Sequence, residues 1–277
     1  MSELTYDSTS RMVQTRQWRI HVNEAGSGPA VFLLHGSGPG ATGWSNFSQN
    51  IPALARDHRV IAVDMPGWGE SDPVSWQDRD HSTALADLMD ALEVDRAAAV
   101  VGNSMGGGTT LRFGYEHPER VERLVTMGSS SGGPTLMGPA GLTEGLKVLQ
   151  KGYRKPSFET MRELVDIMTF DSTFATDELI QGRADMVLAH PEHAQNFIEG
   201  TGKRPVVELD HARLRGITAP TLLFHGRDDR VVHFEHSLRL TSLIPDSRLY
   251  LINGCGHWLQ TEHAEEFTSQ VLHFLQG

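Results

Sequence analysis

Short apolar runs alternate with helical patterns along most of this chain of 277 residues. The runs are rich in β-branched and aliphatic side chains, and they cover residues 30–34, 60–63, 97–101, 124–127, 221–224 and 249–252. Near-continuous apolar strands of this length are typical of a parallel sheet that is covered on both faces. The alternation therefore predicts a doubly wound α/β fold, with a mostly parallel sheet flanked by helices.

The stretch 132–205 interrupts this alternation, because it holds helical patterns but no convincing strand. We therefore expect a helical lid at 132–205, inserted between two parts of the core at 1–131 and 206–277. The apolar residues of the lid could line a substrate pocket or could simply pack the lid on the core. They are Met137, Leu142, Leu146, Met161, Leu164, Met168, Phe170 and Phe174.

The formal net charge of −11 argues against nucleic acid or an anionic membrane surface as a partner. An anionic substrate would therefore need a local positive group. The start of the chain, residues 1–19, is polar and mixed in charge, and no apolar run approaches the length of a membrane span. These features predict a cytoplasmic protein.

Cys255 is the single cysteine, which rules out a disulfide within the chain and argues against a thiolate zinc site. We expect it to be a small buried side chain. Among the 14 histidines, the pairs His190 with His193 and His233 with His236 have a helical spacing that a metal could use. Without further ligands nearby, these pairs favour solvated helix faces, and we expect neither a metal nor a cofactor.

Residues 102–106 read Gly-Asn-Ser-Met-Gly and connect the apolar run 97–101 to a helical pattern. Glycines on both sides of a serine are typical of a nucleophile elbow, in which a sharp strand-to-helix turn leaves no room for a Cβ atom. The turn presents the serine hydroxyl at a helix N-terminus, where backbone N–H groups stabilise an oxyanion. The pattern predicts Ser104 as a nucleophile and the backbone amide of Met105 as an oxyanion donor.

A nucleophilic serine needs a base, and the base needs an acid that orients it. Two adjacent aspartates follow one of the later apolar runs, where a Gly-x-x-Asp spacing favours Asp229 as the acid and leaves Asp228 a turn or surface role. His257 follows the last apolar run and is favoured as the base. The order Ser104, Asp229, His257 is that of the α/β-hydrolases.

The first apolar run, 30–34, leads into His35 and then into a loop of small residues. Small residues allow backbone N–H groups to approach a ligand closely. We expect the backbone amide of Ser37 to complete the oxyanion hole with that of Met105, and His35 to fill space beneath the loop.

Taken together, these motifs resemble those of the meta-cleavage product hydrolases, which are carbon–carbon bond hydrolases within the α/β-hydrolase superfamily. The resemblance covers nearly the whole chain. It rests on residues 35–41 (HGSGPGA), 44–46 (WSN), 102–107 (GNSMGG), 181–183 (QGR), 191–193 (PEH), 226–230 (GRDDR) and 255–258 (CGHW). It implies the α/β-hydrolase fold, with a mostly parallel eight-stranded sheet and an inserted helical lid.

The resemblance implies hydrolysis of a 2-hydroxy-6-oxohexa-2,4-dienoate with a substituent at C6, during bacterial degradation of aromatic compounds. The products would be 2-hydroxypenta-2,4-dienoate and a carboxylic acid. Cleavage of a carbon–carbon bond needs an electron sink, which ketonisation supplies when a proton is delivered to C5. Ser104 would then attack the C6 ketone, and water would clear the acyl-enzyme with His257 as base.

The resemblance also implies that substrate is contacted by Ser37, Gly38, Asn46, Asn103, Thr173, Arg183 and Trp258. Arg183 would pair with the substrate carboxylate or a neighbouring oxygen. Asn46 and Asn103 would hydrogen-bond the dienoate oxygens, and Trp258 would wall the dienoate pocket. Taken singly, these residues are also compatible with a lid salt bridge at Arg183, a turn at Asn46 and a core aromatic at Trp258.

Val231 stands where some related enzymes have an aromatic residue, close to the C6 side of the pocket. A smaller side chain leaves more room there, which favours a bulky aryl substituent over a small alkyl one. Ser37 stands where many relatives have glycine, so its hydroxyl could join the oxyanion hole. We expect a homo-oligomer that acts on a small anionic dienoate.

Two other functions would use the same scaffold. A general carboxylesterase would share the triad, but it would cleave simple aryl esters and leave dienolates untouched. A ligand receptor would use the lid as a switch with vestigial turnover, although the complete set of Ser104, Asp229 and His257 argues against it. Dehalogenases and epoxide hydrolases have aspartate at the position of Ser104.

Overall fold

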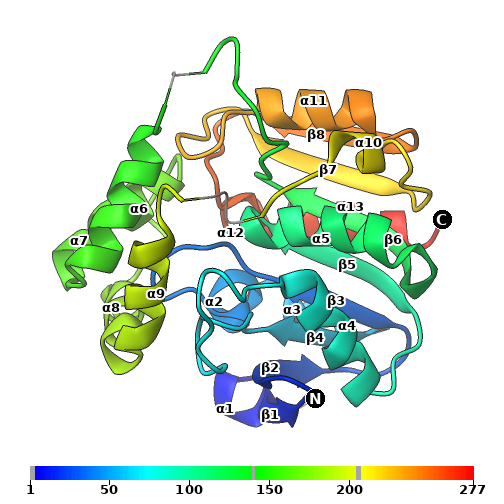
Figure 1. Cartoon of the computed structure of the whole chain (residues 1–277), viewed down its shortest axis with the longest axis horizontal. Helices are drawn as coiled ribbons and strands as arrows, with labels where there is room; N and C mark the ends of the chain where they lie inside the picture. Colours follow the sequence, from blue (N-terminus) through cyan, green and yellow to red (C-terminus); the bar gives the residue numbers. More distant parts are fainter. Residues whose placement is uncertain (1–3, 139–140, 204–206) are drawn as a thin grey trace.

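The computed structural model describes residues 4–138, 141–203 and 207–277. A mixed sheet forms the centre of the molecule (Figure 1), and its strands are β1 (Ser10–Gln14), β2 (Arg19–Ala25), β3 (Ala30–Leu34), β4 (Arg59–Val63), β5 (Ala97–Asn103), β6 (Val121–Met127), β7 (Thr221–Gly226) and β8 (Ser247–Ile252). The order across the sheet is β1-β2-β4-β3-β5-β6-β7-β8. β1 and β2 pair antiparallel with their neighbours, and the remaining pairs are parallel. The predicted eight-stranded, mostly parallel sheet is confirmed.

The register of the parallel strands brings several loops together at one edge of the sheet. Leu34, the last residue of β3, pairs with Gly102 of β5, and Met127, the last residue of β6, pairs with Asn103 and with Phe224 of β7. The carboxyl ends of neighbouring parallel strands are where open α/β sheets bind their ligands. The loops after β3, β5 and β7 therefore meet, and these loops carry the predicted chemistry.

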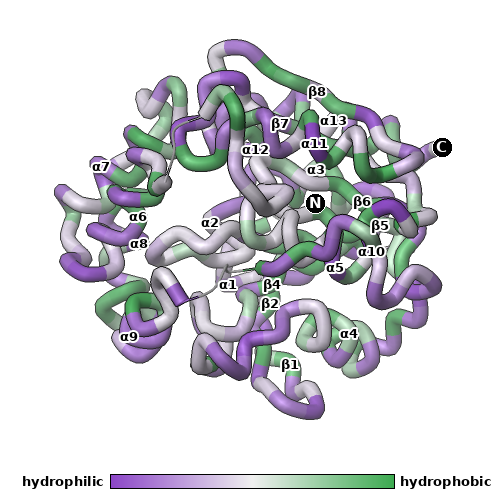
Figure 2. Tube along the Cα trace, turned by 45° about the horizontal axis from the view of Figure 1, so that its top comes forward, coloured by the Kyte–Doolittle hydropathy of each residue, from purple (hydrophilic) through white to green (hydrophobic). Residues whose placement is uncertain are grey.

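Helices cover both faces of the sheet because each buries one apolar side. One core cluster contains apolar residues of α4 (His81–Ala91), α5 (Met105–Glu116) and α11 (Glu235–Leu243). The other contains apolar residues of α2 (Gly43–Phe47), α3 (Ile51–Leu54), α12 (Leu259–Glu262) and α13 (Ala264–Leu275). Figure 2 shows hydrophobic and hydrophilic stretches along α4, as expected for a helix with one buried face. The shorter elements are α1 (Tyr6–Thr9), η1 (Pro118–Arg120) and α10 (His211–Leu214).

The predicted insertion contains α6 (Glu144–Arg154), α7 (Phe158–Met168), α8 (Asp177–Ala189) and α9 (Pro191–Gly200). These helices lie together on one side of the molecule, to the left in Figure 1. α6 is held against the loop after β3, because the Tyr153 hydroxyl donates a hydrogen bond to the Ser37 carbonyl at 2.8 Å. α8 packs on the same loop so closely that a Cβ atom at Gly40 would lie 2.3 Å from the Arg183 carbonyl oxygen. The insertion therefore sits directly over the carboxyl edge of the sheet.

Most of the apolar residues of the insertion do not face a pocket. Met161, Leu164 and Met168 are buried in the core, whereas Met137, Leu142 and Phe170 are exposed and Phe174 is half-buried. The prediction that the lid mainly packs on the core therefore holds for its central helices. Within the described part of the chain, no helix has the length and apolar character to cross a membrane.

Candidate active site

Ser104 lies at a sharp turn between β5 and α5, with φ 54° and ψ −112°. The flanking glycines are required by the packing: a Cβ atom at Gly102 would lie 2.2 Å from the Gly106 carbonyl carbon, and one at Gly106 would lie 2.2 Å from the Leu34 carbonyl oxygen. The backbone N–H of Ser104 donates to the Met127 carbonyl at 2.8 Å, which ties the turn to β6. This is the strained conformation of a nucleophile elbow.

Asp229 and His257, which the sequence predicts as the acid and the base, are in contact. His257 Nδ1 lies 2.7 Å from Asp229 Oδ2. Asp229 Oδ1 accepts hydrogen bonds from the backbone N–H groups of Val231 at 2.7 Å and Val232 at 2.9 Å. Because the carboxylate can only accept, His257 Nδ1 carries the proton and Nε2 has a free lone pair. The ring is thus in the tautomer that a general base requires.

The buried carboxyl of Asp229 is ionised. Desolvation by burial raises its pKa, but the electrostatic interaction with His257 and the contacts of His225 and His257 outweigh this effect and hold the pKa below the usual range. Asp228, the neighbouring aspartate, has the turn role predicted for it, because its Oδ2 accepts a hydrogen bond from the Gly254 backbone at 2.9 Å. Of the two aspartates, Asp229 is therefore the one that contacts His257.

The base is anchored from both sides of its loop. The backbone N–H of His257 donates to the Met168 carbonyl at 2.7 Å, and the His257 carbonyl accepts from the Asn103 side chain at 3.2 Å. Asn103 directly precedes Ser104, so this contact links the base to the elbow. Among the described residues, Ser104 Oγ has no hydrogen-bond partner, and catalytic hydrogen bonds of this kind often form only in the substrate complex.

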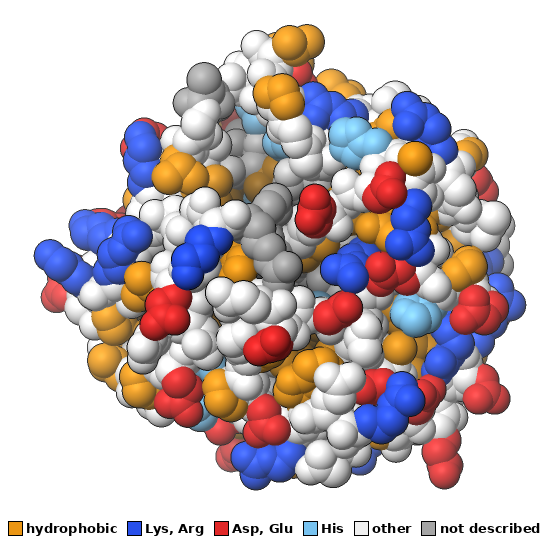
Figure 3. All heavy atoms as spheres, viewed as in Figure 1, with side chains coloured by type: hydrophobic (Ala, Val, Ile, Leu, Met, Phe, Trp, Pro, Cys, Tyr) orange, Lys and Arg blue, Asp and Glu red, His pale blue; other side chains and the backbone are white. Residues whose placement is uncertain are grey.

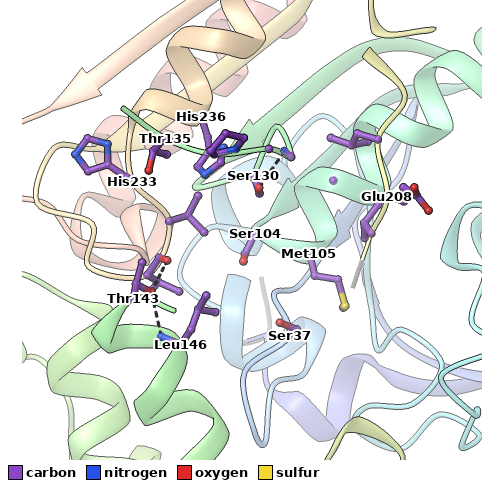
Figure 4. Close-up of a pocket in the computed structure, with 18 of the residues that line it drawn as sticks. Ser37, Ser104, Met105, Ser130, Thr135, Thr143, Leu146, Glu208, His233 and His236 are labelled. Atoms are coloured by element: carbon purple, nitrogen blue, oxygen red, sulfur yellow. Dashed lines mark hydrogen bonds between the residues drawn. The ribbon is translucent and has the colours of Figure 1, made fainter. Parts of the chain in front are cut away.

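Ser37 and Met105 carry the backbone amides that are predicted to form the oxyanion hole. Both residues line the same cavity as Ser104 (Figure 4), and the Gly106 amide donates to the His35 carbonyl at 3.1 Å, which joins the two segments. In the described part of the chain, neither amide has another hydrogen-bond partner. His35 lies beneath the loop as predicted, with Nδ1 donating to the Gly36 carbonyl and Nε2 accepting from the Met65 amide.

A cavity of about 880 Å³ opens beside Ser104. Its walls include the apolar side chains of Met105, Leu146, Val207, Leu209, Val231 and Val232. Polar side chains line the remainder, and they are Ser130, Thr135, Thr143, Glu208, His211, His233 and His236 (Figure 4). The volume is within the range of pockets that bind small organic molecules. The cavity beside the nucleophile therefore offers both apolar and hydrogen-bonding groups.

The prediction that His233 and His236 form a solvated helix face is wrong. Both are half-buried and line this cavity, because α11 begins only at Glu235 and its N-terminal end points towards the site. His236 Nδ1 accepts a hydrogen bond from the Ser131 backbone at 3.2 Å. Burial, with a smaller contribution from Arg239, lowers the pKa of His236 to about 4, so this imidazole is neutral at pH 7.

Arg183 lies in the middle of α8 and is not part of the lining of this cavity. Its guanidinium is stacked 4.4 Å from the ring centroid of Trp258, and Nη1 donates to the Pro39 carbonyl at 3.0 Å. The side chain is buried and has no acidic partner among the described residues, and Nε has no hydrogen-bond partner there. Burial lowers the pKa of Arg183 to about 10, which leaves it charged at neutral pH. A lid salt bridge is therefore excluded for the described residues.

Three further predicted contacts surround this arginine or the elbow. A Cβ atom at Gly38 would lie 3.8 Å from Arg183 Nη1. Asn46 is buried and accepts from the Gly36 amide at 3.5 Å. Asn103 is also buried, and its Oδ1 has no partner among the described residues. Thr173 is different: it is exposed on the loop between α7 and α8 and does not line the cavity, so the structure does not bring it together with the other predicted contacts.

Two residues near the site could not be assigned from the sequence patterns. His225, fully buried at the end of β7, contacts the triad carboxylate, with its Nε2 3.2 Å from Asp229 Oδ2. Tyr153 of α6 links Ser37 to the Trp68 indole, which donates to the tyrosine hydroxyl at 2.7 Å. A signal existed for His225, because it directly follows the apolar run 221–224 and precedes Asp229 by four residues.

The remaining candidate ligands do not form a metal site in the described residues, where no group of three or more His, Cys, Asp or Glu side chains is placed to hold an ion. His190 caps α9, but His193 is buried, with Nε2 3.2 Å from the Gly69 carbonyl, so the predicted solvated face is wrong there as well.

Cys255 is buried as predicted, and burial raises the pKa of its thiol. Figure 3 shows acidic and basic side chains interspersed over the visible face of the molecule.

Comparisons with known proteins agree with this geometry. Residues 31–270 match the model of the Alpha/beta hydrolase family. The 2-hydroxy-6-oxo-6-phenylhexa-2,4-dienoate hydrolase of Burkholderia cepacia is 43% identical, with 99% of each chain covered. The 2-hydroxy-6-oxononadienedioate/2-hydroxy-6-oxononatrienedioate hydrolase of Cupriavidus pinatubonensis is 42% identical, covering 98% of this chain and 97% of that protein.

Solved structures give the same result. A meta-cleavage product hydrolase from Pseudomonas fluorescens superposes with a TM-score of 0.85 at 32% identity, covering 96% of this chain and 97% of that one. The corresponding phenylhexadienoate hydrolase from Rhodococcus also has a TM-score of 0.85, at 27% identity, with 97% of this chain and 98% of that one covered. The chain belongs to the α/β-hydrolase family and, within it, to the meta-cleavage product hydrolases.

Proposed function

We propose that this enzyme hydrolyses the C5–C6 bond of 2-hydroxy-6-oxohexa-2,4-dienoates that carry a substituent at C6. The names of relatives at 42% and 43% identity support the reaction. The Asp229–His257 pair and the exposed turn of Ser104 supply the base and the nucleophile that the reaction needs. The products are 2-hydroxypenta-2,4-dienoate and the carboxylic acid derived from C6.

The chemistry divides into two stages. The dienol first becomes its keto tautomer, as the enol proton is lost and a proton is added at C5. Ser104 Oγ, deprotonated by His257, then attacks the C6 carbonyl, and the backbone amides of Ser37 and Met105 hold the resulting oxyanion. Collapse breaks the C5–C6 bond, and its electron pair passes into the conjugated dienolate. The dienolate takes the proton that His257 removed from Ser104 and leaves as the dienol, which returns His257 to its neutral form. Water, deprotonated by His257, hydrolyses the acyl-enzyme on Ser104.

The buried cation of Arg183 is the observation that carries this proposal. A buried charge is costly unless it is paired, and among the described residues no carboxylate pairs with it. A bound substrate carboxylate would supply the missing partner. Asn103 Oδ1, buried and unpartnered in the described residues, would accept a hydrogen bond from a substrate hydroxyl. Simple esters need neither contact.

The substituent at C6 would extend into the cavity on the opposite side of Ser104. Val231 and Leu146 form an apolar wall there, which supports the aryl group expected from the sequence. The polar residues of the cavity, among them His233 and His236, support a second candidate, a C6 chain that ends in a carboxylate. The two candidates correspond to the two classes of named relatives, phenylhexadienoate and nonadienedioate hydrolases.

We also propose that the protein acts in the cytoplasm as a homo-oligomer. Support for self-association comes from β8, which is an edge strand of the sheet and exposes Tyr250 and Leu251. Such an edge presents unpaired backbone groups and apolar side chains to a second copy. Sedimentation equilibrium would test this, and a purely monomeric species at micromolar concentration would contradict it.

An Arg183→Ala variant tests the proposal. A hydrogen bond to a charged partner contributes about 1.5–3 kcal/mol, which corresponds to a loss of about 10- to 150-fold in kcat/KM on a 6-phenyl dienolate. Hydrolysis of a neutral aryl benzoate, which transfers the same benzoyl group, should change less than about threefold. Arg162→Ala is the matched control, because Arg162 is a partly exposed lid arginine paired with Asp177. Equal losses on both substrates would contradict the carboxylate contact.

A further inference from the structure

The carboxylate of Asp229 is shared by two histidines. His257 Nδ1 lies 2.7 Å from Oδ2, and His225 Nε2 lies 3.2 Å from the same oxygen. The other oxygen, Oδ1, is occupied by the backbone amides of Val231 and Val232. Both histidines and Asp229 are buried. The triad acid therefore has a second imidazole in direct contact, at the same oxygen as the base.

The hydrogen-bond partners of His225 determine its tautomer. Nε2 faces two acceptors, the Val232 carbonyl at 2.8 Å and Asp229 Oδ2, so Nε2 must carry a proton. Nδ1 lies 2.7 Å from the Ser237 hydroxyl. In the neutral ring Nδ1 accepts, so the hydroxyl of Ser237 donates to it. Ser237, on α11, thus keeps the N–H of His225 directed at the Val232 carbonyl, with Asp229 Oδ2 beside it at 3.2 Å.

We propose that His225 is a positioning residue of the triad. It fixes the rotamer of Asp229, and it weakens the hydrogen bond that Asp229 Oδ2 accepts from His257. The proposal goes beyond the proposed function and rests on it only for the roles of Asp229 and His257. A carboxylate oxygen that already accepts one N–H is a weaker acceptor for a second. His257 is therefore held in place by an acid whose charge is partly compensated.

The surroundings leave few other groups that could do this. The titratable residues that face His225 and Asp229 are His257, His236 on α11, Cys255 and Asp228. Cys255 and Asp228 are held by backbone contacts of their own, with Cys255 Sγ 3.6 Å from the Gly256 carbonyl and Asp228 Oδ2 2.9 Å from the Gly254 amide. Of these groups, the two imidazoles contact the carboxylate of Asp229: His257 by a hydrogen bond, and His225 with its Nε2 3.2 Å from the same oxygen.

The test is the pH dependence of kcat/KM in a His225→Phe variant. Loss of the donor concentrates the charge of Asp229 on His257, which then keeps its proton to higher pH. The acidic limb of the kcat/KM profile should move to higher pH by about half a unit or more. We expect kcat to fall about tenfold, with little change in KM. His225→Gln, whose side-chain amide can donate, should restore at least half of both effects.

An aryl benzoate is the substrate for this test, because it needs the triad but not the dienoate contacts. A failure of the carbon–carbon assignment therefore leaves the readout intact. His81→Phe is the matched control: His81 is a buried histidine on α4 that donates a hydrogen bond to the Pro66 carbonyl and does not touch the triad. Circular dichroism and thermal unfolding of every variant monitor the fold.

A His225→Phe enzyme that unfolds at lower temperature but keeps the wild-type pH profile, with kcat within about twofold, would overturn the proposal and leave His225 a purely structural residue. If His225→Phe does not fold, Ser237→Ala carries the test. Without the serine hydroxyl the tautomer of His225 is no longer fixed. The acidic limb of the kcat/KM profile should therefore also move to higher pH, by a smaller amount than in His225→Phe. An unmoved limb in Ser237→Ala would equally contradict the proposal.

Discussion

The two sides of Ser104 are built differently. On the side of Arg183 and Trp258 the side chains are buried, and the cation stacks on the indole at 4.4 Å. On the side of Val231 and His236 there is a cavity of about 880 Å³, and half-buried polar groups such as His236 are part of its lining. The Arg183 side is closely packed around a buried charge, whereas the Val231 side is a large cavity lined by both apolar and polar groups.

This difference fits a substrate with one constant end and one variable end. Every substrate of the proposed class has the same dienoate, so its site can be closely packed around one buried cation. The C6 substituent differs between substrates, and a larger cavity tolerates such variation because its walls contribute less to binding a particular shape. The reacting carbon lies where the two sides meet, next to Ser104.

The largest expected effect is that of removing the nucleophile. Ser104→Ala should lower kcat by about a thousandfold or more on both dienolates and esters. Both sides of the site remain, so the variant should still bind a 6-phenyl dienolate and change its visible spectrum. Stopped-flow absorbance measures binding and turnover together. Release of the acid product at a rate near that of the wild type would show that another residue is the nucleophile.

Filling the cavity on the Val231 side should make the enzyme discriminate between substrates by the size of their C6 substituent. Val231→Phe places a ring in the cavity wall and should lower kcat/KM for a 6-phenyl dienolate by about tenfold, while a 6-methyl dienolate changes little. Leu146→Ala, in the apolar lining of the same cavity, enlarges the space and serves as the matched variant. Steady-state kinetics on both substrates decide the outcome. Equal losses on the two would place the C6 group elsewhere.

The smallest expected effect concerns stability on the Val231 side. The folded-state pKa of His236 is about 4, below its value of 6.5 in an unfolded chain. Between these values the unfolded state binds the proton first, so the free energy of unfolding falls as the pH is lowered from 6.5 towards 4. Because the ring is half-buried, the slope from this residue should be less than about 1 kcal/mol per pH unit.

A His236→Asn variant should flatten that slope in urea titrations across this pH window. His273→Asn is the control, because His273 is exposed on α13. Unchanged slopes in the His236 variant would mean that the polar wall of the cavity does not contribute to acid sensitivity.

The features that the sequence predicted well are those that depend on local pattern. Buried parallel strands need continuous apolar runs, and β3 begins and ends at the residues expected for it. The elbow around Ser104 needs glycine on both sides, and its spacing is therefore visible without the fold. The order of Ser104, Asp229 and His257 follows from where three strands end.

Features that depend on tertiary contacts were missed or misjudged. β1 and β2 are short antiparallel strands at the edge of the sheet, and the polar start of the chain gave no apolar run to mark them. His236 looked like a surface residue because its helical spacing says nothing about where the end of α11 points. His225 gained its partner, Asp229, only when β7 and the following turn folded against α11.

The most direct test of the central claim is product analysis with the wild-type enzyme. A purified 6-phenyl dienolate should lose its visible colour and yield benzoate and 2-hydroxypenta-2,4-dienoate in equal amounts, without added metal or nucleotide. Its kcat/KM should exceed that for a neutral aryl benzoate by about tenfold or more. An enzyme that hydrolyses the ester but leaves a panel of 6-aryl and 6-alkyl dienolates unchanged would contradict the carbon–carbon assignment.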